Sequence, residues 1–236
     1  MKNLVLACLL CAIATNVKGQ KTIEKNIDHN NQYIEVDVKF ASTIEVKTWD
    51  KSNIYVKADI WTKDEKYQDL YQLNVIQNSS HITIVSDTEA IFNAFHDAWK
   101  RDGPNQKGYG YTTKRYEFDY VVYVPKNARF KVSSINGSLQ SELIEGEFEA
   151  ALVNGNIDIK NYLGNLDLNT INGEIDLKVG NANFMAETIN GDIYADKQLQ
   201  VKSYDRHVGQ KIEHRINGSS SKLSLNTVNG NMYLRL

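Results

Sequence analysis

The sequence contains very little cysteine and proline, with 2 of each among 236 residues. Both cysteines, Cys8 and Cys11, lie in an apolar segment at the N-terminus, so we expect no disulfide, thiolate metal site or cysteine nucleophile in the rest of the chain. The 27 basic residues are balanced by 29 acidic ones, which excludes the concentrated positive charge that nucleic-acid binding needs. The remaining composition, 42% hydrophobic and 24% charged, is that of an ordinary folded protein.

The N-terminal apolar segment is too short for a membrane-spanning helix. It follows Lys2 and precedes a polar stretch, which is the layout of a secretory signal peptide. Small residues permit cleavage after Ala14 or after Gly19, and we favour Gly19. We therefore expect residues 1–19 to be removed and residues 20–236 to be exported to the periplasm, the cell surface or the extracellular space. An integral membrane protein is not expected.

An apolar repeat of nine residues runs through the second half of the chain. Two apolar positions separated by one residue recur at this interval, and a glycine recurs two residues before the first of them. Because successive side chains of a strand point to opposite faces, the two apolar positions share one face. Each unit therefore predicts a turn and a short strand. The first position holds Leu139, Phe148, Ile157, Leu166, Ile175, Phe184 and Ile193, and the second holds Ser141, Ala150, Ile159, Leu168, Leu177, Ala186 and Ala195.

Asparagine precedes the glycine in every second unit, that is, every eighteen residues. Asn-Gly pairs are favoured in turns where the backbone has positive φ, so we expect that conformation here. The alternation predicts coils with two unequal sides of nine residues, whose Asn-Gly turns lie one above another. The expected structural turn residues are Asn136, Gly137, Asn154, Gly155, Asn172, Gly173, Asn190, Gly191, Asn229 and Gly230.

The chain from residue 20 onward indicates an all-β fold. In its first half, Ile34, Ile44 and Ile54 begin apolar-polar-apolar triplets at intervals of ten residues. A translational repeat favours a β-solenoid, similar to a β-helix, with about eighteen residues per coil. The alternative is an antiparallel β-meander or sandwich, because Asn-Gly between alternating strands is also a hairpin signal. We expect one domain, residues 20–236, with insertions at 87–115 and 196–222.

The sequence around these turns resembles the secreted bacterial family known as "putative adhesin", a domain of unknown function built from β-strand repeats. The resemblance implies a non-catalytic adhesin or binding scaffold of the cell envelope and supplies no catalytic residues. It gives no role to residues 88–114. The segments that carry it are 48–50 (TWD), 123–130 (YVPKNARF), 134–137 (SING), 170–175 (TINGEI), 188–193 (TINGDI) and 222–230 (KLSLNTVNG).

The repeat also carries acidic residues between its apolar positions, at Asp158, Asp167 and Asp176. In coils of eighteen residues Asp158 and Asp176 would stack about 4.8 Å apart, where like charges repel. We interpret these side chains as a solvent-exposed face, with a bridging calcium ion as the alternative. The 5 histidines show no metal-ligand spacing. We therefore expect no metal and no cofactor.

Catalysis is not expected either. A polysaccharide-processing β-helix enzyme is the less favoured alternative, because it needs convergent carboxylates, or a carboxylate with Arg or Lys, on one face. The outward positions of the repeat offer no such cluster. They hold Gln140, Glu149, Asp158, Asp167, Asp176, Met185 and Tyr194.

The two insertions are the predicted contact regions, because binding residues concentrate on loops beside a regular scaffold. The spacing of Ile91, Phe92, Phe95 and Trp99 predicts one face of a short helix, which we interpret chiefly as a cap on the core. The expected partner is a glycan or a protein on a cell surface or in the envelope. The candidate contact residues are Trp99, Lys100, Arg101, Tyr109, Tyr111, Arg206 and His207.

Two further expectations concern partners. A periplasmic protein that acts in envelope maintenance or signalling through protein contacts is the alternative function. The strand edges at the ends of a solenoid also predict a homo-oligomer, because an unpaired edge can add a strand from another copy.

Overall fold

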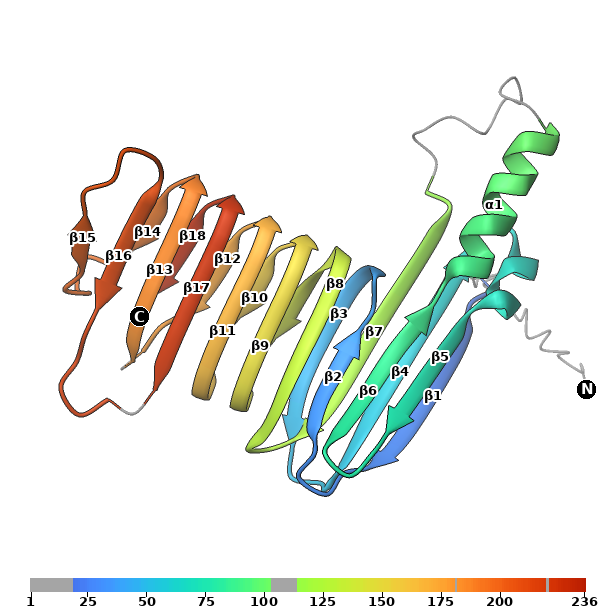
Figure 1. Cartoon of the computed structure of the whole chain (residues 1–236), viewed down its shortest axis with the longest axis horizontal. Helices are drawn as coiled ribbons and strands as arrows, with labels where there is room; N and C mark the ends of the chain where they lie inside the picture. Colours follow the sequence, from blue (N-terminus) through green and yellow to red (C-terminus); the bar gives the residue numbers. More distant parts are fainter. Residues whose placement is uncertain (1–18, 103–113, 181, 220) are drawn as a thin grey trace, which may run out of the picture.

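The computed structural model describes residues 19–102, 114–180, 182–219 and 221–236. The described residues form 18 strands joined in one mixed sheet, with one α-helix, α1 (Glu89–Asp102), and one short 3-10 helix, η1 (Glu65–Leu70). The sheet bends into two layers that face each other over a common apolar core (Figure 1). The all-β prediction is confirmed. None of the helices in these residues is long and apolar enough to span a membrane.

The layer nearer the viewer in Figure 1, the front layer, contains the longer sides of the repeat units. In spatial order it holds β5 (Gln72–Gln77), β6 (His81–Asp87), β2 (Tyr33–Asp37), the first part of β8 (Ala128–Ser141), β9 (Ile144–Asn154), β11 (Tyr162–Asn172), β17 (Lys222–Asn229), β13 (Asn183–Asn190), β16 (Gln210–His214) and β15 (Lys202–Tyr204).

The back layer contains the shorter sides. It holds β14 (Ile193–Ala195), β18 (Met232–Arg235), β12 (Ile175–Lys178), β10 (Ile157–Ile159), the second part of β8, β3 (Phe40–Trp49), β7 (Tyr116–Pro125), β4 (Asn53–Thr62) and β1 (Lys21–Asp28).

Neighbouring units of the repeat pair in parallel and in register. Phe148 of β9 lies beside Leu166 of β11, eighteen residues later, and Ile157 of β10 lies beside Ile175 of β12. These four residues are buried, as are the other predicted apolar positions except Ile193 and Ala195, which are partly exposed. The predicted eighteen-residue offset is confirmed, and so are the core positions before Ile193. The antiparallel alternative is wrong for these strands. Antiparallel pairs occur elsewhere, at β1–β4, β4–β7, β5–β6, β13–β16 and β15–β16.

The units are not stacked in chain order throughout. β17 lies between β11 and β13, so Leu223 contacts both Leu166 and Phe184 as register partners. In the back layer β18 lies in the same way between β12 and β14. The expected stacking of each Asn-Gly turn on the previous one is therefore wrong between Asn172 and Asn190, where Asn229 intervenes. The last unit of the chain is inserted instead, because all units expose the same apolar rows and the segment after Ala195 is long enough to return.

The asparagines of the predicted turns form a hydrogen-bonded ladder that follows this spatial order. From the second asparagine of the ladder onward, each Nδ2 donates to the Oδ1 of the asparagine before it, over distances of 2.7 to 3.0 Å. The ladder passes through Asn136, Asn154, Asn172, Asn229 and Asn190. The side-chain amide, which both donates and accepts, thus holds successive turns in register.

Among the five predicted Asn-Gly turns, the expected positive φ is found at Gly137 alone. At the other four turns glycine is required by close approach. A Cβ on Gly173 would lie 2.0 Å from the carbonyl oxygen of Gly155, which is far inside van der Waals contact. Thr170 donates a 2.9 Å hydrogen bond to that same carbonyl from inside the core. The turns are therefore stacked backbone on backbone.

The two insertions cover parts of the stack near its two ends. Helix α1 confirms the predicted helix: Ile91 is fully buried, and the ring of Phe92 lies 4.6 Å from that of Phe40. At the other end β16 pairs with β13, and the three-residue β15 pairs with β16. The backbone N–H of Ile193 in β14 donates to Gln210 Oε1 at 2.8 Å. The edge of β13 is thus covered, which leaves little strand edge at that end for the expected end-to-end pairing.

Candidate functional site

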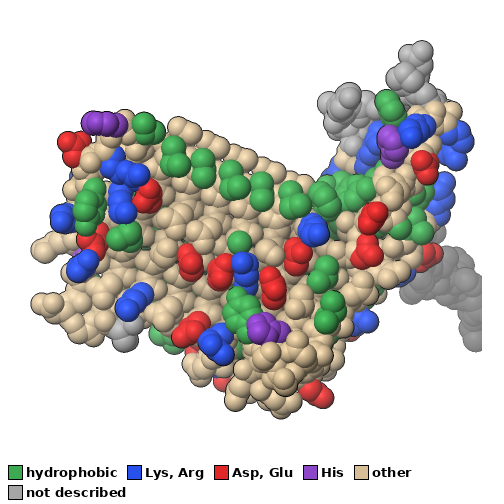
Figure 2. Space-filling view, in the orientation of Figure 1, with side chains coloured by type: hydrophobic (Ala, Val, Ile, Leu, Met, Phe, Trp, Pro, Cys, Tyr) green, Lys and Arg blue, Asp and Glu red, His purple; other side chains and the backbone are tan. Residues whose placement is uncertain are grey.

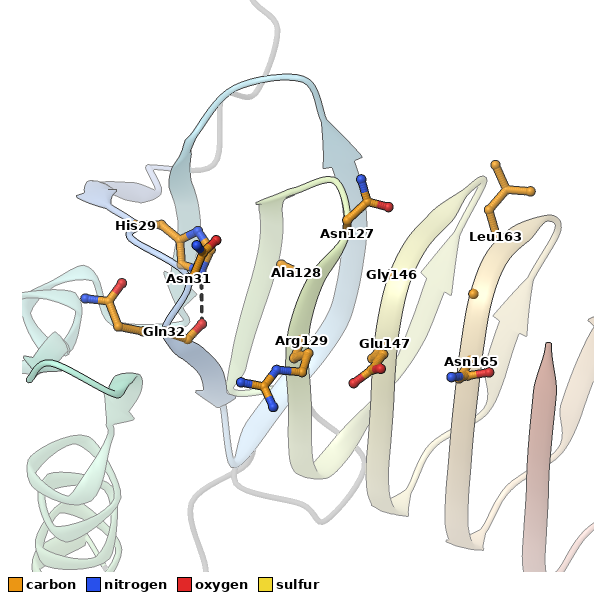
Figure 3. Close-up of a pocket in the computed structure, with 11 residues that line it drawn as sticks. His29, Asn31, Gln32, Asn127, Ala128, Arg129, Gly146, Glu147, Leu163 and Asn165 are labelled. Carbon is orange, nitrogen blue, oxygen red and sulfur yellow. Dashed lines mark hydrogen bonds between the residues drawn. The ribbon is translucent and has the colours of Figure 1, made fainter. Parts of the chain in front are cut away.

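An open groove crosses the lower part of the front layer. One part, of about 480 Å³, lies between the loop 29–32 and the first residues of β8, β9 and β11 (Figure 3). A second part, of about 510 Å³, continues across the same strands to β17. Arg129, Glu147 and Asn165 line both parts. We call the two together the cross-strand groove.

The side chains along the groove come from one register row. Arg129 is the register partner of Glu147, and Glu147 is the partner of Asn165. Tyr33 and Lys222 extend the row on either side, because their neighbours Ile34 and Leu223 pair with Phe130 and Leu166. The residue that follows each of them is buried, so strand alternation turns the row outward. The row presents, in order, Tyr33, Arg129, Glu147, Asn165 and Lys222.

Two glycines allow the strands to approach at one end of the groove. Gly146 and Gly164 have φ of 137° and 128°, a region that side chains rarely adopt. A Cβ on Gly164 would lie 2.0 Å from the carbonyl oxygen of Gly146. Side chains are therefore excluded here, and Figure 3 shows the bare ribbon between Glu147 and Leu163.

The loop beside the groove is fixed by its own polar side chains. Nε2 of His29 lies 2.9 Å from the carbonyl oxygen of Gln32, as Figure 3 shows by the dashed line. The backbone N–H of Asn30 donates to Gln32 Oε1 at 2.6 Å, and Gln32 Nε2 donates to the carbonyl oxygen of Asn78 at 3.3 Å. Asn31 adopts a φ of 62°, which asparagine tolerates better than most residues. This wall of the groove is thus held before any ligand binds.

Charges of both signs alternate over the groove. Lys131 forms a 2.7 Å ion pair with Glu149 in the row above Arg129 and Glu147. Burial, followed by the nearby Glu149 carboxylate, raises the pKa of the Tyr33 hydroxyl above its ordinary value. Tyr33 therefore stays protonated at neutral pH and can donate a hydrogen bond. Guanidinium, carboxylate, amide and phenol groups side by side suit a ligand that is rich in hydroxyl or amide groups.

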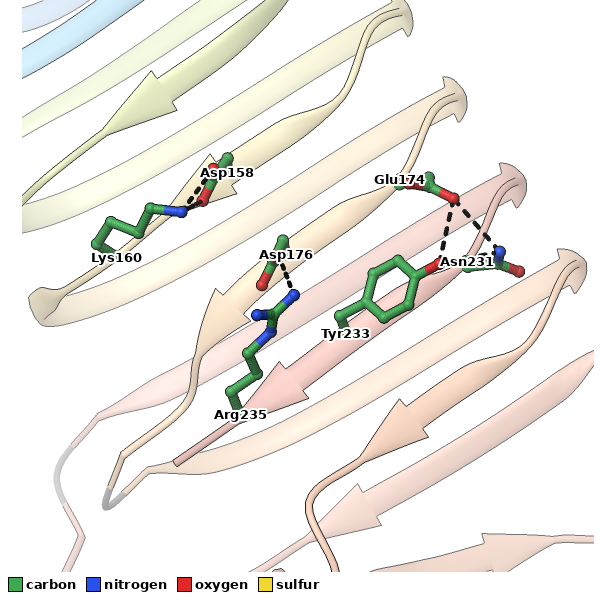
Figure 4. A network of polar contacts seen from close by, with 7 residues as sticks. All are labelled: Asp158, Lys160, Glu174, Asp176, Asn231, Tyr233 and Arg235. Carbon is green, nitrogen blue, oxygen red and sulfur yellow. Dashed lines mark hydrogen bonds and ion pairs between the residues drawn. The ribbon is translucent and has the colours of Figure 1, made fainter.

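The outer face of the back layer carries a second polar row. Asp158 and Asp176 are register partners, as expected, and each has its own basic partner: Lys160 at 2.7 Å and Arg235 at 2.5 Å (Figure 4). These ion pairs offset the repulsion between the carboxylates without a bridging ion. In the part of the chain that the structure describes, no three His, Cys, Asp or Glu residues are grouped to hold a metal.

The same face includes aromatic and amide groups at its C-terminal end. Glu174 Oε1 accepts hydrogen bonds from Asn231 Nδ2 at 3.3 Å and from the Tyr233 hydroxyl at 3.4 Å (Figure 4). The ring of Tyr233 stacks on that of Tyr194, with centroids 5.4 Å apart and planes 10° apart. The stacked rings face each other, so this row presents mainly ring edges to a ligand.

The candidate contact residues from the sequence are not brought together. Trp99, Lys100 and Arg101 lie on α1, where Trp99 is 43% exposed and stacks on His96. Arg206 and His207 lie between β15 and β16, at the opposite end of the molecule (Figure 1). Arg206 forms an ion pair with Glu187. Tyr109 and Tyr111 lie outside the described residues.

Sequence reasoning missed the groove. Its central residues, Arg129, Glu147 and Asn165, are separated by eighteen residues and directly precede Phe130, Phe148 and Leu166. The eighteen-residue interval between these residues can therefore be read from the sequence. The residues differ in chemistry, however, so they give no motif until the register shows that they are neighbours.

Comparisons with known proteins give a likeness of fold. No family model matches the sequence, and no curated protein matches it. A solved structure from Clostridium sporogenes, described as a putative cell adhesion protein, is similar with a TM-score of 0.57 at 10% identity, covering 92% of this chain and 99% of that chain. A putative adhesin from Bacteroides fragilis is similar with a TM-score of 0.41 at 12% identity, covering 92% and 98%. At such identities the first likeness shows a shared fold.

Proposed function

We propose that this chain is a non-catalytic binding protein of the bacterial cell envelope, an adhesin or binding scaffold whose ligand occupies the cross-strand groove. The observation that carries the proposal is the row Tyr33, Arg129, Glu147, Asn165 and Lys222, displayed on a register-locked sheet beside a pre-formed wall. Rigid elements hold such a row without an ordering cost on binding. The description of the Clostridium sporogenes protein as a "putative cell adhesion protein" supports the same role.

The proposal includes the architecture and the export of the chain. The eighteen-residue parallel register supports a β-solenoid of nine-residue half-coils, in which the β17–β18 unit is inserted before the β13–β14 unit. The layout of the N-terminal residues supports removal of residues 1–19 as a signal peptide. Residues 20–236 then form one domain with insertions at 87–115 and 196–222.

A binding role fits the groove better than glycoside cleavage. Cleavage uses two carboxyl groups on opposite sides of the scissile bond, one as an acid. In the groove Glu149 is ion-paired with Lys131, and Asp167 Oδ1 accepts a hydrogen bond from Asn169 at 2.9 Å. These two carboxylates lie in one row, and Glu147, the third carboxylate of the groove, lies on the same outer face two residues before Glu149. This arrangement favours recognition of a ligand.

The proposal is tested by a binding screen with matched variants. The purified protein is passed over immobilised glycans and envelope or matrix proteins, and Arg129→Ala is compared with Lys178→Ala, which removes an exposed positive charge from the back layer. We expect Arg129→Ala to weaken binding about tenfold or more, the loss of one charged hydrogen bond, and Lys178→Ala to leave it unchanged. Equal affinities of the wild type and Arg129→Ala for every bound ligand would contradict the groove as the site.

A further inference from the structure

The front layer exposes a row of aliphatic side chains just before its Asn-Gly turns. Ile135, Ile171 and Ile189 are 38%, 44% and 44% exposed, and Val153 and Val228 are partly exposed between them. Figure 2 shows this row of hydrophobic side chains crossing strand after strand above the charged residues. We call it the aliphatic stripe: in spatial order Ile135, Val153, Ile171, Val228 and Ile189.

The stripe reverses the usual polarity of a sheet. At β11, Thr170 points into the core and is 4% exposed, while the next residue, Ile171, points to solvent. The same inversion occurs at Thr227 and Val228 of β17. The buried threonine hydroxyls have partners, because each donates to a glycine carbonyl of the neighbouring unit. These hydrogen bonds explain why the threonines are buried, but they do not explain why aliphatic residues are exposed beside them. Exposed apolar rows mark interaction surfaces.

The surface next to the stripe is uncharged over most of its length. The adjacent outward row on the side away from the turns carries small or amide side chains at four successive strands, and its fifth member, Glu187, is ion-paired with Arg206 and with Lys211. The next row, by contrast, contains Glu149 and Asp167. The four uncharged residues are Ser133, Ala151, Asn169 and Asn226.

We propose that the aliphatic stripe docks against the aliphatic stripe of a second copy of this chain. In a two-fold contact the same patch lies on both sides of the interface, so a patch that is uncharged over most of its length brings few like charges together. The asparagine ladder beside the stripe is also compatible with docking of two copies, because side-chain amides both donate and accept hydrogen bonds.

The order of the residues fits self-docking. Isoleucine and valine alternate along the stripe, at the strand spacing of about 4.8 Å. Two antiparallel stripes displaced by one strand overlap at four positions, where each isoleucine lies opposite a valine, and the branched side chains interdigitate as they do in dry β-sheet interfaces. A partner with the same spacing matches all four overlapping positions, and another copy of the chain has that spacing.

The contact is expected to be weak in solution. Five side chains cover much less than the roughly 800 Å² per partner of a stable interface. Where copies are held side by side on a surface, multivalency would strengthen the contact between them. The inference does not depend on the ligand of the cross-strand groove, since self-association is measured with the purified chain alone.

The first test is sedimentation equilibrium from micromolar to millimolar protein. We expect the average mass of the wild type to rise towards that of a dimer, and a triple variant, Ile135→Thr, Ile171→Thr and Ile189→Thr, to raise the dimer Kd by at least about tenfold through lost apolar burial. Threonine keeps the branched Cβ that strands favour. The control is Ile76→Thr on β5, a 63% exposed isoleucine outside the stripe, which should leave the Kd unchanged.

The second test uses charge at the centre of the stripe. Ile171→Glu and Ile171→Lys should each be monomeric, and an equimolar mixture should recover a dimer, which a merely misfolded variant would not do. A wild type that stays monomeric at millimolar concentration would overturn the proposal. So would a dimer that the triple variant leaves intact, or stripe-dependent binding of a monomer to lipid vesicles or a glycan.

Discussion

The two halves of the molecule use different means to build the same pair of layers. Between residues 20 and 102 there is no glycine, and the strands there pair in mixed directions around a core that includes the rings of Phe118 and Tyr120. The repeat half, from β8 onward, has a glycine at nearly every turn and parallel register throughout its coils. The first half is held by bulky side-chain packing, and the repeat half adds backbone contact and an amide ladder to its apolar core.

The difference affects where functional surfaces arise. In the repeat half each outward position has a register partner on the neighbouring strand, so outward side chains form rows across the sheet. These rows are the cross-strand groove, the row of Asp158 and Asp176 with their ion pairs, and the aliphatic stripe. The first half is irregular and contributes closing elements. Its loop 29–32 forms one wall of the groove, and Phe40 and Tyr67 receive the rings of α1.

The largest effect is expected from a substitution that disrupts the backbone stacking of the repeat half. Gly173→Ala would place a Cβ 2.0 Å from the carbonyl oxygen of Gly155, and neither backbone can move without disturbing its own neighbours. We expect a loss of about 3 kcal/mol or more in the free energy of unfolding, measured by urea denaturation.

The matched control is Gly180→Ala. No atom lies within 4 Å of the added Cβ, and φ is 48°, so only the cost of a left-handed alanine applies, about 1 kcal/mol. Equal losses for the two variants would show that the turns are not held by close approach.

The next largest effect is expected from substitutions in the asparagine ladder, and it measures how much the ladder stabilises the fold. Asn172→Ala removes two ladder hydrogen bonds, of 2.8 and 2.7 Å, whereas Asn136→Ala at the end of the ladder removes one, of 3.0 Å. We expect destabilisation of about 1–2 kcal/mol for Asn172→Ala and about half of that for Asn136→Ala. Thermal unfolding of both variants would measure the difference, and a larger loss at Asn136 would contradict a ladder.

The smallest expected effect concerns the strands that cover the edge of the repeat half. Hydrogen bonds from Arg206 and Lys211 lower the pKa of Glu187, and those from Tyr204 and Arg215 lower the pKa of Glu213. A lowered pKa in the fold means that each carboxylate stabilises the fold above its ordinary value of 4.5, and that this contribution is lost as pH falls through the lowered value.

Amide exchange of β16 should therefore become faster below about pH 4.5, before the β9 and β11 amides do. The variant Glu187→Gln should make β16 exchange less dependent on pH. Exchange of β16 that follows the global unfolding of the protein at every pH would contradict this local opening.

Much of the repeat half could be predicted from the sequence. The apolar period identified which residues are buried, such as Phe148 and Leu166, and the Asn-Gly interval identified the eighteen-residue offset. The period could not identify which unit lies next to which, because β13 and β17 carry the same pattern of apolar residues and, of these two, only β17 pairs with β11. It also gave the wrong reason for most of the turn glycines, since close approach to a neighbouring carbonyl depends on the stacking itself.

The candidate site could be predicted less well. The sequence directed attention to Trp99 and Arg206, which are distinctive in composition but lie far apart (Figure 1). The groove residues Arg129 and Glu147 can be recognised as part of one site only when they are known to be neighbours across strands. A row on a repeat surface is a property of the register, and the register becomes known when the pairing of the strands is known.

The measurement that tests the account most directly is protease shaving of intact cells that express a tagged copy of the chain, compared with lysed cells. An adhesin must be reachable from outside, so we expect cleavage of the tag on intact cells whose envelope is shown to be unbroken. Protection until lysis would contradict a surface role and direct the search to partners in the periplasm.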